Sequence, residues 1–380
     1  MKNILIVIDS LGYGGAEKVL YTYLQHWDTR KYSITVVPIV DTGVYSSKVK
    51  KMTEISYSPV ISSSSNYLKN IFNKILYKLV YQYLPANWVY TLFIPKNHDI
   101  EIAFCEGFVT KLISKSSNKK AKKIAWIHTD LVTNNWPLSI GVFKDKTEEI
   151  GAYAAYDSIV GVSQLVCDGF KDSFGLSNIS CIYNPLDKNE INNLATKAVI
   201  NNSKKTIRLV SVGRLVYDKG YDLLVQSISI LISRGIIVDL TIIGEGTMRN
   251  QLEKLIHDLD ITEHVHLLGF KDNPYQYMKE ADIYISSSRF EGFSLAIAEA
   301  MILGLPVIST KCAGPLELLD NGSAGMMVEC TTESIANGIY EMVTHPEILE
   351  LYRDKSNERQ KYFSIENSIH QTNQIFEKEG

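Results

Sequence analysis

The sequence predicts an α/β protein built from two doubly wound, parallel-sheet domains. Its 380 residues are enough for two domains of ordinary size. Short apolar runs alternate with helical patterns, and this alternation occurs twice along the chain. Apolar residues make up 45% and charged residues 21%, which is the balance of a folded protein and excludes low-complexity or collagen-like chains.

The first domain is expected over residues 1–187 and begins with a buried strand at 4–8. This run is too short for the core of a signal peptide or for a membrane span. A helix is expected at 16–24, and further strands are expected at 34–37, 100–104 and 123–127. Strands that alternate with helices predict a parallel sheet covered on both faces.

The second domain is expected over residues 206–360, after a polar, Asn-rich linker at 188–205. Its strands are expected at 207–212, 238–243, 265–268, 283–285 and 307–309. Two such domains would face a central cleft lined by the carboxyl ends of their strands, where ligands bind in this fold class.

The charge of the chain is unevenly distributed, with a net charge of −3 overall. The part that ends at Glu190 carries +4 and the remainder −7, so the N-terminal half is expected to face an anionic surface. The overall balance argues against a nucleic-acid binder. Five widely separated cysteines without a CxxC pair fit neither a disulfide framework nor a zinc site, which favours a reducing cytoplasm.

Residues 55–98 contain no Asp or Glu, and within them apolar residues recur at helical spacing. The recurring residues are Leu68, Ile71, Phe72, Ile75, Leu76, Leu79, Val80, Tyr83 and Leu84. Lys74 and Lys78 are expected on the opposite face. Two interpretations stay open. The helix packs its apolar face on the sheet, or it lies on anionic lipid with help from the lysine-rich run at 111–123.

The segment 286–301 carries the densest chemical signal, because it runs from a strand through a loop into a helix. Gly292 allows a close turn, so the amides of Phe293, Ser294 and Leu295 can point at an anion such as a diphosphate. Glu291 and Glu299 flank these amides and can accept hydrogen bonds from the hydroxyls of a sugar and a ribose. Taken without this context, both glutamates would be ordinary solvated residues.

A second cluster follows the strand at 207–212, where Gly213 precedes Arg214 and Lys219. A planar guanidinium and a point charge at a strand end can together neutralise a leaving diphosphate. Near the N-terminus, Gly14 and Gly15 stand between a strand and a helix, but the GxGxxG spacing of a dinucleotide fingerprint is missing. A nicotinamide dehydrogenase is therefore not expected.

Together these motifs resemble the retaining glycosyltransferases of family 4, which have the GT-B fold and build bacterial surface polysaccharides. The resemblance spans nearly the whole chain and includes the two glutamates separated by seven residues, Glu291 and Glu299. It also covers the segments 14–17, 126–130, 183–187, 213–220 and 244–246. Each motif alone is weak evidence for this resemblance, whereas the number and the order of the motifs are specific to it.

The resemblance implies a role for each candidate residue. Arg214 and Lys219 would hold the diphosphate of the donor, Glu299 the ribose, and Glu291 the transferred sugar. Gly15 would lie beside the phosphates, Gly269 and Phe270 beside the base, and His128 would face the sugar and the acceptor. It also implies a C-terminal helix within 361–380 that crosses back to the N-terminal domain.

The implied reaction is transfer of a hexose or N-acetylhexosamine from a nucleotide diphosphate sugar, expected to be UDP-linked, with retention. The expected acceptor is a glycan or a polyprenyl-diphosphate-linked oligosaccharide, and the expected location is the cytoplasm or the inner face of the cell membrane. No cofactor and no metal are expected, because fixed cations and helix amides can stabilise the leaving diphosphate. A DxD motif at 258–260 lies in a helical stretch away from the donor motifs and is interpreted as a surface helix end.

Two alternatives stay open. A nucleotide-sugar epimerase shares the fold, although the four charged residues favour transfer. A non-catalytic partner of another transferase is expected to have lost these charges, whereas Arg214, Lys219, Glu291 and Glu299 are all present.

Overall fold

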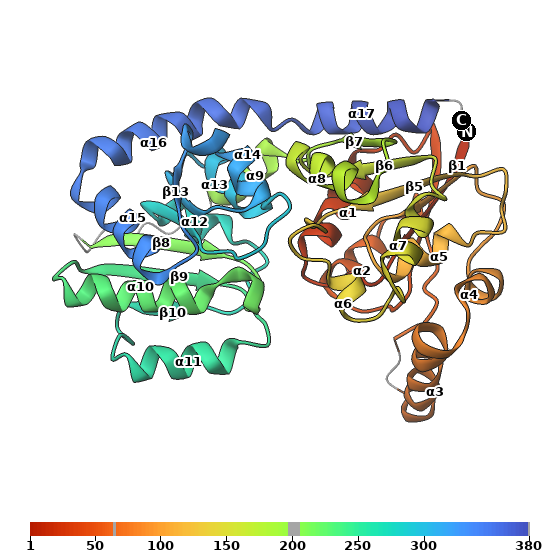
Figure 1. Cartoon of the computed structure of the whole chain (residues 1–380), viewed down its shortest axis with the longest axis horizontal. Coiled ribbons are helices and arrows are strands. Elements are labelled where there is room, and N and C mark those ends of the chain that lie inside the picture. Colours follow the sequence, from red (N-terminus) through yellow and green to blue (C-terminus); the bar gives the residue numbers. More distant parts are fainter. Residues whose placement is uncertain (64–65, 197–205, 379–380) are drawn as a thin grey trace. The chain divides into compact units, whose positions relative to one another are not determined.

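The structure, a computed structural model, describes residues 1–63, 66–196 and 206–378. The chain divides into two compact units (Figure 1). Unit 1 comprises Met1–Pro185 and Glu366–Gly380, and unit 2 comprises Leu186–Ile365.

Unit 1 is built on a seven-stranded sheet with strand order β3-β2-β1-β4-β5-β6-β7, in which all neighbours are parallel. The strands are β1 (Lys2–Ile8), β2 (Tyr32–Pro38), β3 (Ile55–Tyr57), β4 (Ile100–Ala103), β5 (Lys122–Ile127), β6 (Ser158–Gly161) and β7 (Ile179–Cys181). The chain runs outward from β1 to β3 and returns to β4 on the other side of β1. The switch point of this sheet, where loops diverge to make room for ligands, therefore lies between β1 and β4.

Helices from both ends of the chain cover this sheet. They are α1 (Gly15–His26), α2 (Val44–Val49), α3 (Tyr67–Lys78), the π-helix η1 (Leu79–Tyr83), α4 (Ala86–Phe93), α5 (Phe108–Ser114), α6 (Trp136–Ser139), α7 (Lys146–Tyr153), α8 (Gln164–Phe174) and α17 (Ile365–Glu377). The C-terminal helix α17 packs in unit 1, where the Phe376 ring lies 5.6 Å from Trp27 and 5.5 Å from Tyr32. The Lys2 ammonium also donates to the Phe376 carbonyl at 2.6 Å, so the two chain ends are joined.

Unit 2 is built on a six-stranded parallel sheet with order β10-β9-β8-β11-β12-β13. Its strands are β8 (Ile207–Val212), β9 (Val238–Ile243), β10 (Val265–Leu267), β11 (Ile283–Ser286), β12 (Val307–Thr310) and β13 (Met326–Val328). Its helices are α9 (Lys188–Ala195), η2 (Tyr217–Lys219), α10 (Tyr221–Ser233), α11 (Arg249–Asp258), α12 (Tyr275–Glu280), α13 (Leu295–Ile302), α14 (Ala313–Leu318), η3 (Asp320–Gly322), α15 (Thr332–Thr344), α16 (Pro346–Arg359) and η4 (Gln360–Tyr362). Here the switch point lies between β8 and β11.

The prediction of two doubly wound parallel sheets is confirmed. The segment predicted as a linker differs, because its first half is helix α9 of unit 2. The Asp187 side chain caps this helix by accepting from the Glu190 amide at 2.9 Å, and Ile191 and Ala195 are buried. Residues 197–205 of the predicted linker lie outside the described residues.

The helix predicted in the acid-free segment forms as α3 and η1. The interpretation in which its apolar face packs on the sheet holds for Leu76, Val80 and Leu84, which pack in the core of unit 1. It is wrong for the rest of the face, because no residue of α3 is fully buried and several of its large apolar side chains are exposed. Within the described ranges, no helix has the length and hydropathy needed to cross a bilayer. All five cysteines are free thiols.

Candidate functional site

Two loops meet at the switch point of the unit 2 sheet, one after β8 and one after β11. They bring together Lys219 and Glu291, whose Nζ and Oε2 atoms form an ion pair. Both side chains remain partly accessible, at 23% and 16% exposed, so a ligand can reach them. The sequence predicted the two residues as separate contacts to a donor, and the structure joins them although they lie 72 positions apart.

The loop after β11 holds Glu291 in place through contacts with the next strand and helix. The Ser288 carbonyl accepts hydrogen bonds from Thr310 Oγ1 at 2.5 Å and from Cys312 Sγ at 3.0 Å. The Gly314 amide donates to the Glu291 carbonyl at 3.0 Å. Ser294 then begins α13 with φ of 67°, a left-handed conformation that a serine adopts only where its surroundings impose it.

Helix α13 carries the second predicted carboxylate, Glu299. It is 2% exposed, and the Tyr275 hydroxyl donates to its Oε1 at 3.3 Å. Gly292, Phe293 and Ser294 are buried at the start of this helix, and Leu295 is its first residue. Glu299 therefore lies in a far more enclosed environment than Glu291.

The ends of β8, β9 and β10 form the other side of this site. The Gly244 amide donates to the Gly269 carbonyl at 3.0 Å, and a Cβ at Gly244 would lie 1.9 Å from the Gly213 carbonyl oxygen. Gly213 is followed by Arg214, which is exposed and whose guanidinium makes no hydrogen bond or ion pair with the described part of the chain, although its carbonyl accepts from the Val216 amide at 2.9 Å. Phe270 is 39% exposed beside Gly269. Apart from Leu295 and Glu299 of α13, the predicted donor residues of unit 2 therefore lie on loops at one edge of its sheet.

A pair of residues that the sequence reasoning missed connects the two loops. Arg289 makes a bidentate ion pair with Asp222, with N–O distances of 2.8 and 2.7 Å. Its guanidinium also donates to the Tyr217 carbonyl at 2.8 Å and stacks 4.1 Å from the centre of the Tyr217 ring. Burial alone would raise the pKa of Asp222, but Arg289 outweighs burial and lowers it. Arg289 thus clamps the short η2 helix, which carries Lys219.

We expect Asp222→Asn to raise the donor KM by about tenfold, equivalent to roughly 1.4 kcal/mol, with a smaller change in kcat. The reason is that η2 loses the clamp that orients Lys219, while the chemistry of Lys219 itself is unchanged. Steady-state kinetics with varied donor would measure this split. Glu350→Gln, which breaks an exposed Arg353 pair on α16, is the control and should leave KM unchanged. An equal donor KM in Asp222→Asn and wild type would refute the clamp.

Unit 1 has a second cluster of polar side chains at its own switch point. Asp9 follows β1 directly, and its two carboxylate oxygens accept from the Tyr81 hydroxyl at 2.9 Å and the Cys105 thiol at 3.6 Å. Burial raises the pKa of Asp9 to about 6, and the nearby carboxylates of Glu17 and Glu106 add to the rise. The sequence reasoning assigned no role to Asp9 or Glu106, although both stand just after buried strands.

His128 belongs to this cluster. Its backbone amide donates to Glu106 Oε2 at 3.1 Å, and Thr129 donates its hydroxyl to the other oxygen of Glu106. The ring Nε2 lies 3.0 Å from the Phe104 carbonyl oxygen. A carbonyl only accepts, so Nε2 carries the proton, and burial lowers the pKa of the ring and favours its neutral form. Nδ1 is then a hydrogen-bond acceptor.

The glycine loop after β1 leads from Asp9 into α1. Gly14 precedes the first residue of this helix, Gly15, and a Cβ at Gly14 would lie 2.2 Å from Glu17 Oε2. Glycine is therefore required at this position if Glu17 keeps its place. The predicted approach of Gly15 to the donor phosphates stays a prediction, as does the predicted cleft.

Asp9 allows a prediction about stability and pH. Its pKa of about 6 lies above the ordinary 3.8, so the folded protein binds this proton more tightly than the unfolded chain does. Stability is therefore lost as pH rises between about 4 and 6. Above pH 6 the carboxylate is charged, and its destabilising effect on unit 1 has reached its full size. We expect Asp9→Asn to raise Tm by about 2–4 °C at pH 7.5 and much less at pH 4. Thermal unfolding followed by circular dichroism would measure this, and equal shifts at both pH values would refute the charge effect.

Comparison with known proteins relates unit 2 to a family. Residues 193–361 match the model of the family described as glycosyl transferases group 1. The matched residues lie within unit 2. A relative from Campylobacter jejuni is 27% identical over 368 residues, 96% of both chains, and is named N-acetylgalactosamine-N,N'-diacetylbacillosaminyl-diphospho-undecaprenol 4-alpha-N-acetylgalactosaminyltransferase.

Solved structures agree with this fold. A variant of Staphylococcus aureus TarM, crystallised with fondaparinux, alpha-GlcNAc-glycerol and UDP, matches with a TM-score of 0.76 at 15% identity over 100% of both chains. Anabaena HepE in complex with UDP matches with a TM-score of 0.72 at 18% identity over 99% of both chains. The chain therefore has the GT-B fold that the sequence motifs implied.

The DxD motif lies away from the unit 2 cluster. Asp258 is the last residue of the surface helix α11, and Asp260 is exposed in the turn that follows. This is the predicted surface helix end. Within the described ranges, no group of three or more His, Cys, Asp or Glu residues could hold a metal ion.

Proposed function

We propose that this chain is a glycosyltransferase that moves a hexose or N-acetylhexosamine from a UDP-sugar to a lipid-linked or oligosaccharide acceptor of a surface polysaccharide. We further propose that it retains the anomeric configuration and needs no metal ion. The observation that carries the proposal is the Lys219–Glu291 pair at the switch point of unit 2, next to the exposed Arg214. This pair combines a cation suited to a diphosphate with a carboxylate suited to sugar hydroxyls.

In this mechanism the bond between the anomeric carbon and the diphosphate oxygen breaks, and a bond to the acceptor oxygen forms on the same face of the sugar. The acceptor hydroxyl gives its proton to an oxygen of the leaving diphosphate. Arg214 and Lys219 stabilise the negative charge that this diphosphate gains. Because that charge grows during the reaction, both cations favour the transition state over the bound donor.

The remaining side chains position the substrates. Glu291 accepts hydrogen bonds from hydroxyls of the transferred sugar, and Glu299 accepts from the ribose. His128, neutral and with Nδ1 as an acceptor, receives a hydrogen bond from a hydroxyl of the sugar or the acceptor. Gly269 and Phe270 border the base.

Two features support a UDP-sugar donor and a lipid-linked acceptor at the membrane. The HepE and TarM structures contain UDP, and the name of the Campylobacter relative includes an undecaprenol-linked diphosphate. The net charge of +4 in the part that ends at Glu190 suits the anionic inner face of a cell membrane.

The test is a thermal-shift and hydrolysis screen of UDP-glucose, UDP-galactose, their N-acetyl forms and GDP-mannose, with magnesium or with EDTA. We expect one UDP-sugar to raise Tm and to be hydrolysed slowly in EDTA, and NMR of the transferred product to show an unchanged anomeric configuration. Activity lost in EDTA would refute metal independence. Release of an epimerised sugar would indicate an epimerase. If no compound of the panel, including UDP and GDP alone, raises Tm or is hydrolysed, the result would indicate a non-catalytic partner.

A further inference from the structure

Helix α3 exposes a continuous apolar face. Leu68, Phe72 and Ile75 are 74%, 60% and 53% exposed, and Ile71 and Leu79 are also exposed. With about 100° between successive residues, these side chains fall on one side of the helix. Monomeric proteins rarely leave such a contiguous apolar surface uncovered, which indicates that this face has a partner.

Lysines border this face. At the same helical spacing, Lys69 lies at one margin of the apolar stripe, and Lys74 and Lys78 lie at the other. All three are exposed. At this spacing Lys74 and Lys78 also lie opposite Leu76 and Val80, the members of the predicted apolar face that pack on unit 1. An apolar stripe between lysines, in a segment without acidic residues, suits the headgroup region of an anionic bilayer.

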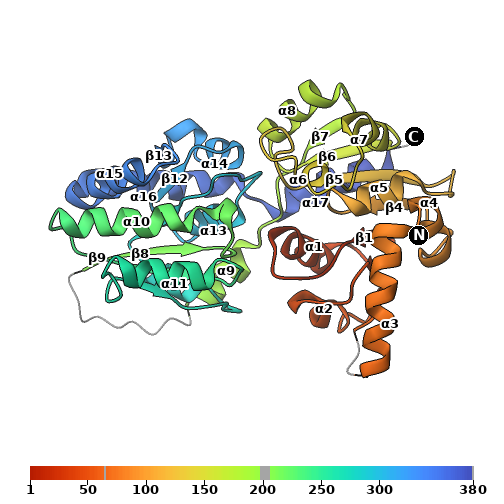
Figure 2. The same ribbon diagram turned by 60° about the horizontal axis from the view of Figure 1, so that its bottom comes forward.

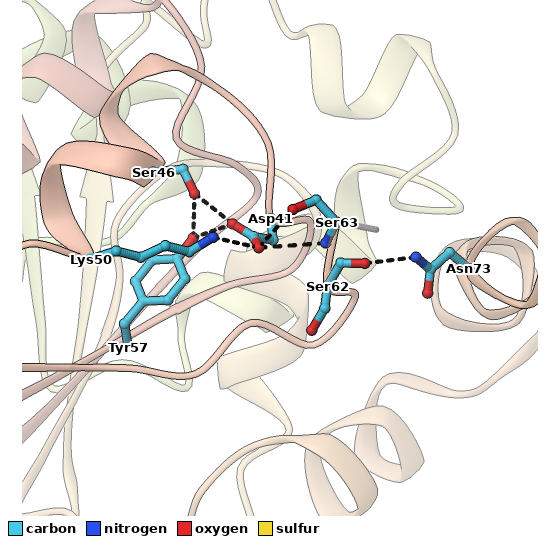
Figure 3. A network of polar contacts seen from close by, with 7 residues as sticks. All are labelled: Asp41, Ser46, Lys50, Tyr57, Ser62, Ser63 and Asn73. Atoms are coloured by element: carbon cyan, nitrogen blue, oxygen red, sulfur yellow. Dashed lines mark hydrogen bonds and ion pairs between the residues drawn. The ribbon is translucent and has the colours of Figure 1, made fainter. Parts of the chain in front are cut away.

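The inner side of α3 is held by a network of polar contacts (Figure 3). Asn73 donates to the Ser62 carbonyl at 2.6 Å, and the neighbouring Ser63 hydroxyl donates to the buried Asp41 at 3.1 Å. Lys50 and Tyr57 donate to the same carboxylate at 2.7 and 2.8 Å. Burial alone would raise the pKa of Asp41, but these hydrogen bonds outweigh it and lower the pKa strongly.

The C-terminal end of α3 continues into η1, which fastens the helix to the sheet. Val80 is fully buried, and Tyr81 reaches Asp9 at the switch point of unit 1. Figure 2 shows α3 extending from the rest of unit 1, with η1 at its attached end. The exposed face therefore belongs to a helix that is held at its C-terminal end by η1 and near its middle by Asn73, and it projects from the same sheet edge that carries His128.

We propose that α3 is a docking helix that lays its apolar face into an anionic lipid surface, between Lys69 on one side and Lys74 and Lys78 on the other. The proposal rests on the proposed function, because docking would bring this sheet edge to the layer where a lipid-linked acceptor is held. A second copy fits less well. Two α3 faces packed across a two-fold axis would bring lysines from both copies together, and residues 55–98 contain no acidic side chain to pair with them.

The test measures flotation of the full chain with vesicles of neutral phosphatidylcholine, with and without 30 mol% phosphatidylglycerol. We expect binding only with phosphatidylglycerol, and a loss of binding at 0.5 M salt. The triple variant Leu68→Gln, Phe72→Gln, Ile75→Gln should reduce the bound fraction at least tenfold. The triple variant Lys69→Gln, Lys74→Gln, Lys78→Gln should remove the preference for phosphatidylglycerol.

Matched triple variants in unit 2 serve as controls. Ile237→Gln, Leu351→Gln, Tyr362→Gln replaces similarly exposed apolar side chains, and Lys254→Gln, Lys279→Gln, Lys361→Gln replaces exposed lysines. Both controls should float like wild type. All six α3 positions are exposed, so unchanged Tm is expected, and slow hydrolysis of the donor in solution should persist in the α3 variants.

Two other outcomes overturn the docking proposal. If the α3 variants float as wild type does, the lipid contact lies elsewhere on the chain. A dimer by light scattering that the apolar triple variant converts to a monomer would assign the face to a second copy. Absence of donor hydrolysis in wild type, with flotation intact, would refute the proposed function and leave the docking helix standing.

Discussion

Replacing Lys219 with methionine is expected to lower kcat/KM for transfer by about 10²–10³-fold, the usual effect of removing one group that stabilises a developing oxyanion. Methionine keeps the length of the side chain, so the change removes the charge with little change in packing. The variant loses the cation for the diphosphate and also leaves the Glu291 carboxylate, 16% exposed, without its ion-pair partner. Steady-state kinetics and donor hydrolysis would measure the effect, with Tm as the check on folding.

The double variant Lys219→Met, Glu291→Gln separates these two losses. If Lys219 also serves to neutralise Glu291, the double variant should be less impaired than the product of the two single effects predicts, because no unpaired carboxylate then faces the diphosphate. Lys254→Met, on the exposed side of α11, is the control and should retain full activity. Turnover of Lys219→Met within about threefold of wild type would contradict the assigned role.

The two longest strands of unit 2 were predicted over their full length. Ile207–Val212 and Val238–Ile243 have three and four buried residues among their six, which gives a clear pattern. The strands that were missed have three or four residues, among them Ile179–Cys181 and Met326–Val328. Val265–Leu267 is equally short and was predicted, so length alone does not separate the two groups, and the place of a short strand is decided by neighbouring strands.

The chemistry of the site was easier to predict than its contacts. Lys219 and Glu291 stand out by residue type and by their position after strands, but their pairing depends on the strand order, which places β8 beside β11. The same holds for Asp9 and Tyr81, 72 positions apart. A carboxylate directly after a buried strand was the available signal for Asp9.

The environment of α3 could not be predicted for a different reason. Helical periodicity shows that one side of a helix is apolar, and it does not show whether the fold provides a surface to cover that side. Here Asn73 and Val80 make the contacts with unit 1, and the larger apolar side chains are left outside. Burial is a property of the assembled unit, so only the structure could show which apolar side chains of this segment are covered.

Gly314→Ala is expected to reduce kcat/KM by about 10²-fold, although the residue has no reactive group and stands outside the predicted motifs. Gly314 lies in the first turn of α14, directly against the loop that carries Glu291. An added Cβ would lie 2.5 Å from the Phe293 nitrogen and 2.6 Å from its Cα. Because the obstructing atoms are backbone, the whole loop must shift. A displacement of about 1 Å of a positioning group is enough for such a loss.

The matched control is Gly151→Ala, a substitution in helix α7 where nothing lies within 4 Å of the added Cβ. It should leave activity unchanged and stabilise unit 1 by about 0.5–1 kcal/mol, because alanine is the better helix former. Gly314→Ala should instead lower Tm, since overpacking costs about 1–3 kcal/mol. A folded Gly314→Ala variant with wild-type kinetics would show that the loop can move without displacing Glu291. Catalysis would then be less sensitive to the position of this loop than the packing of Gly314 against Phe293 implies.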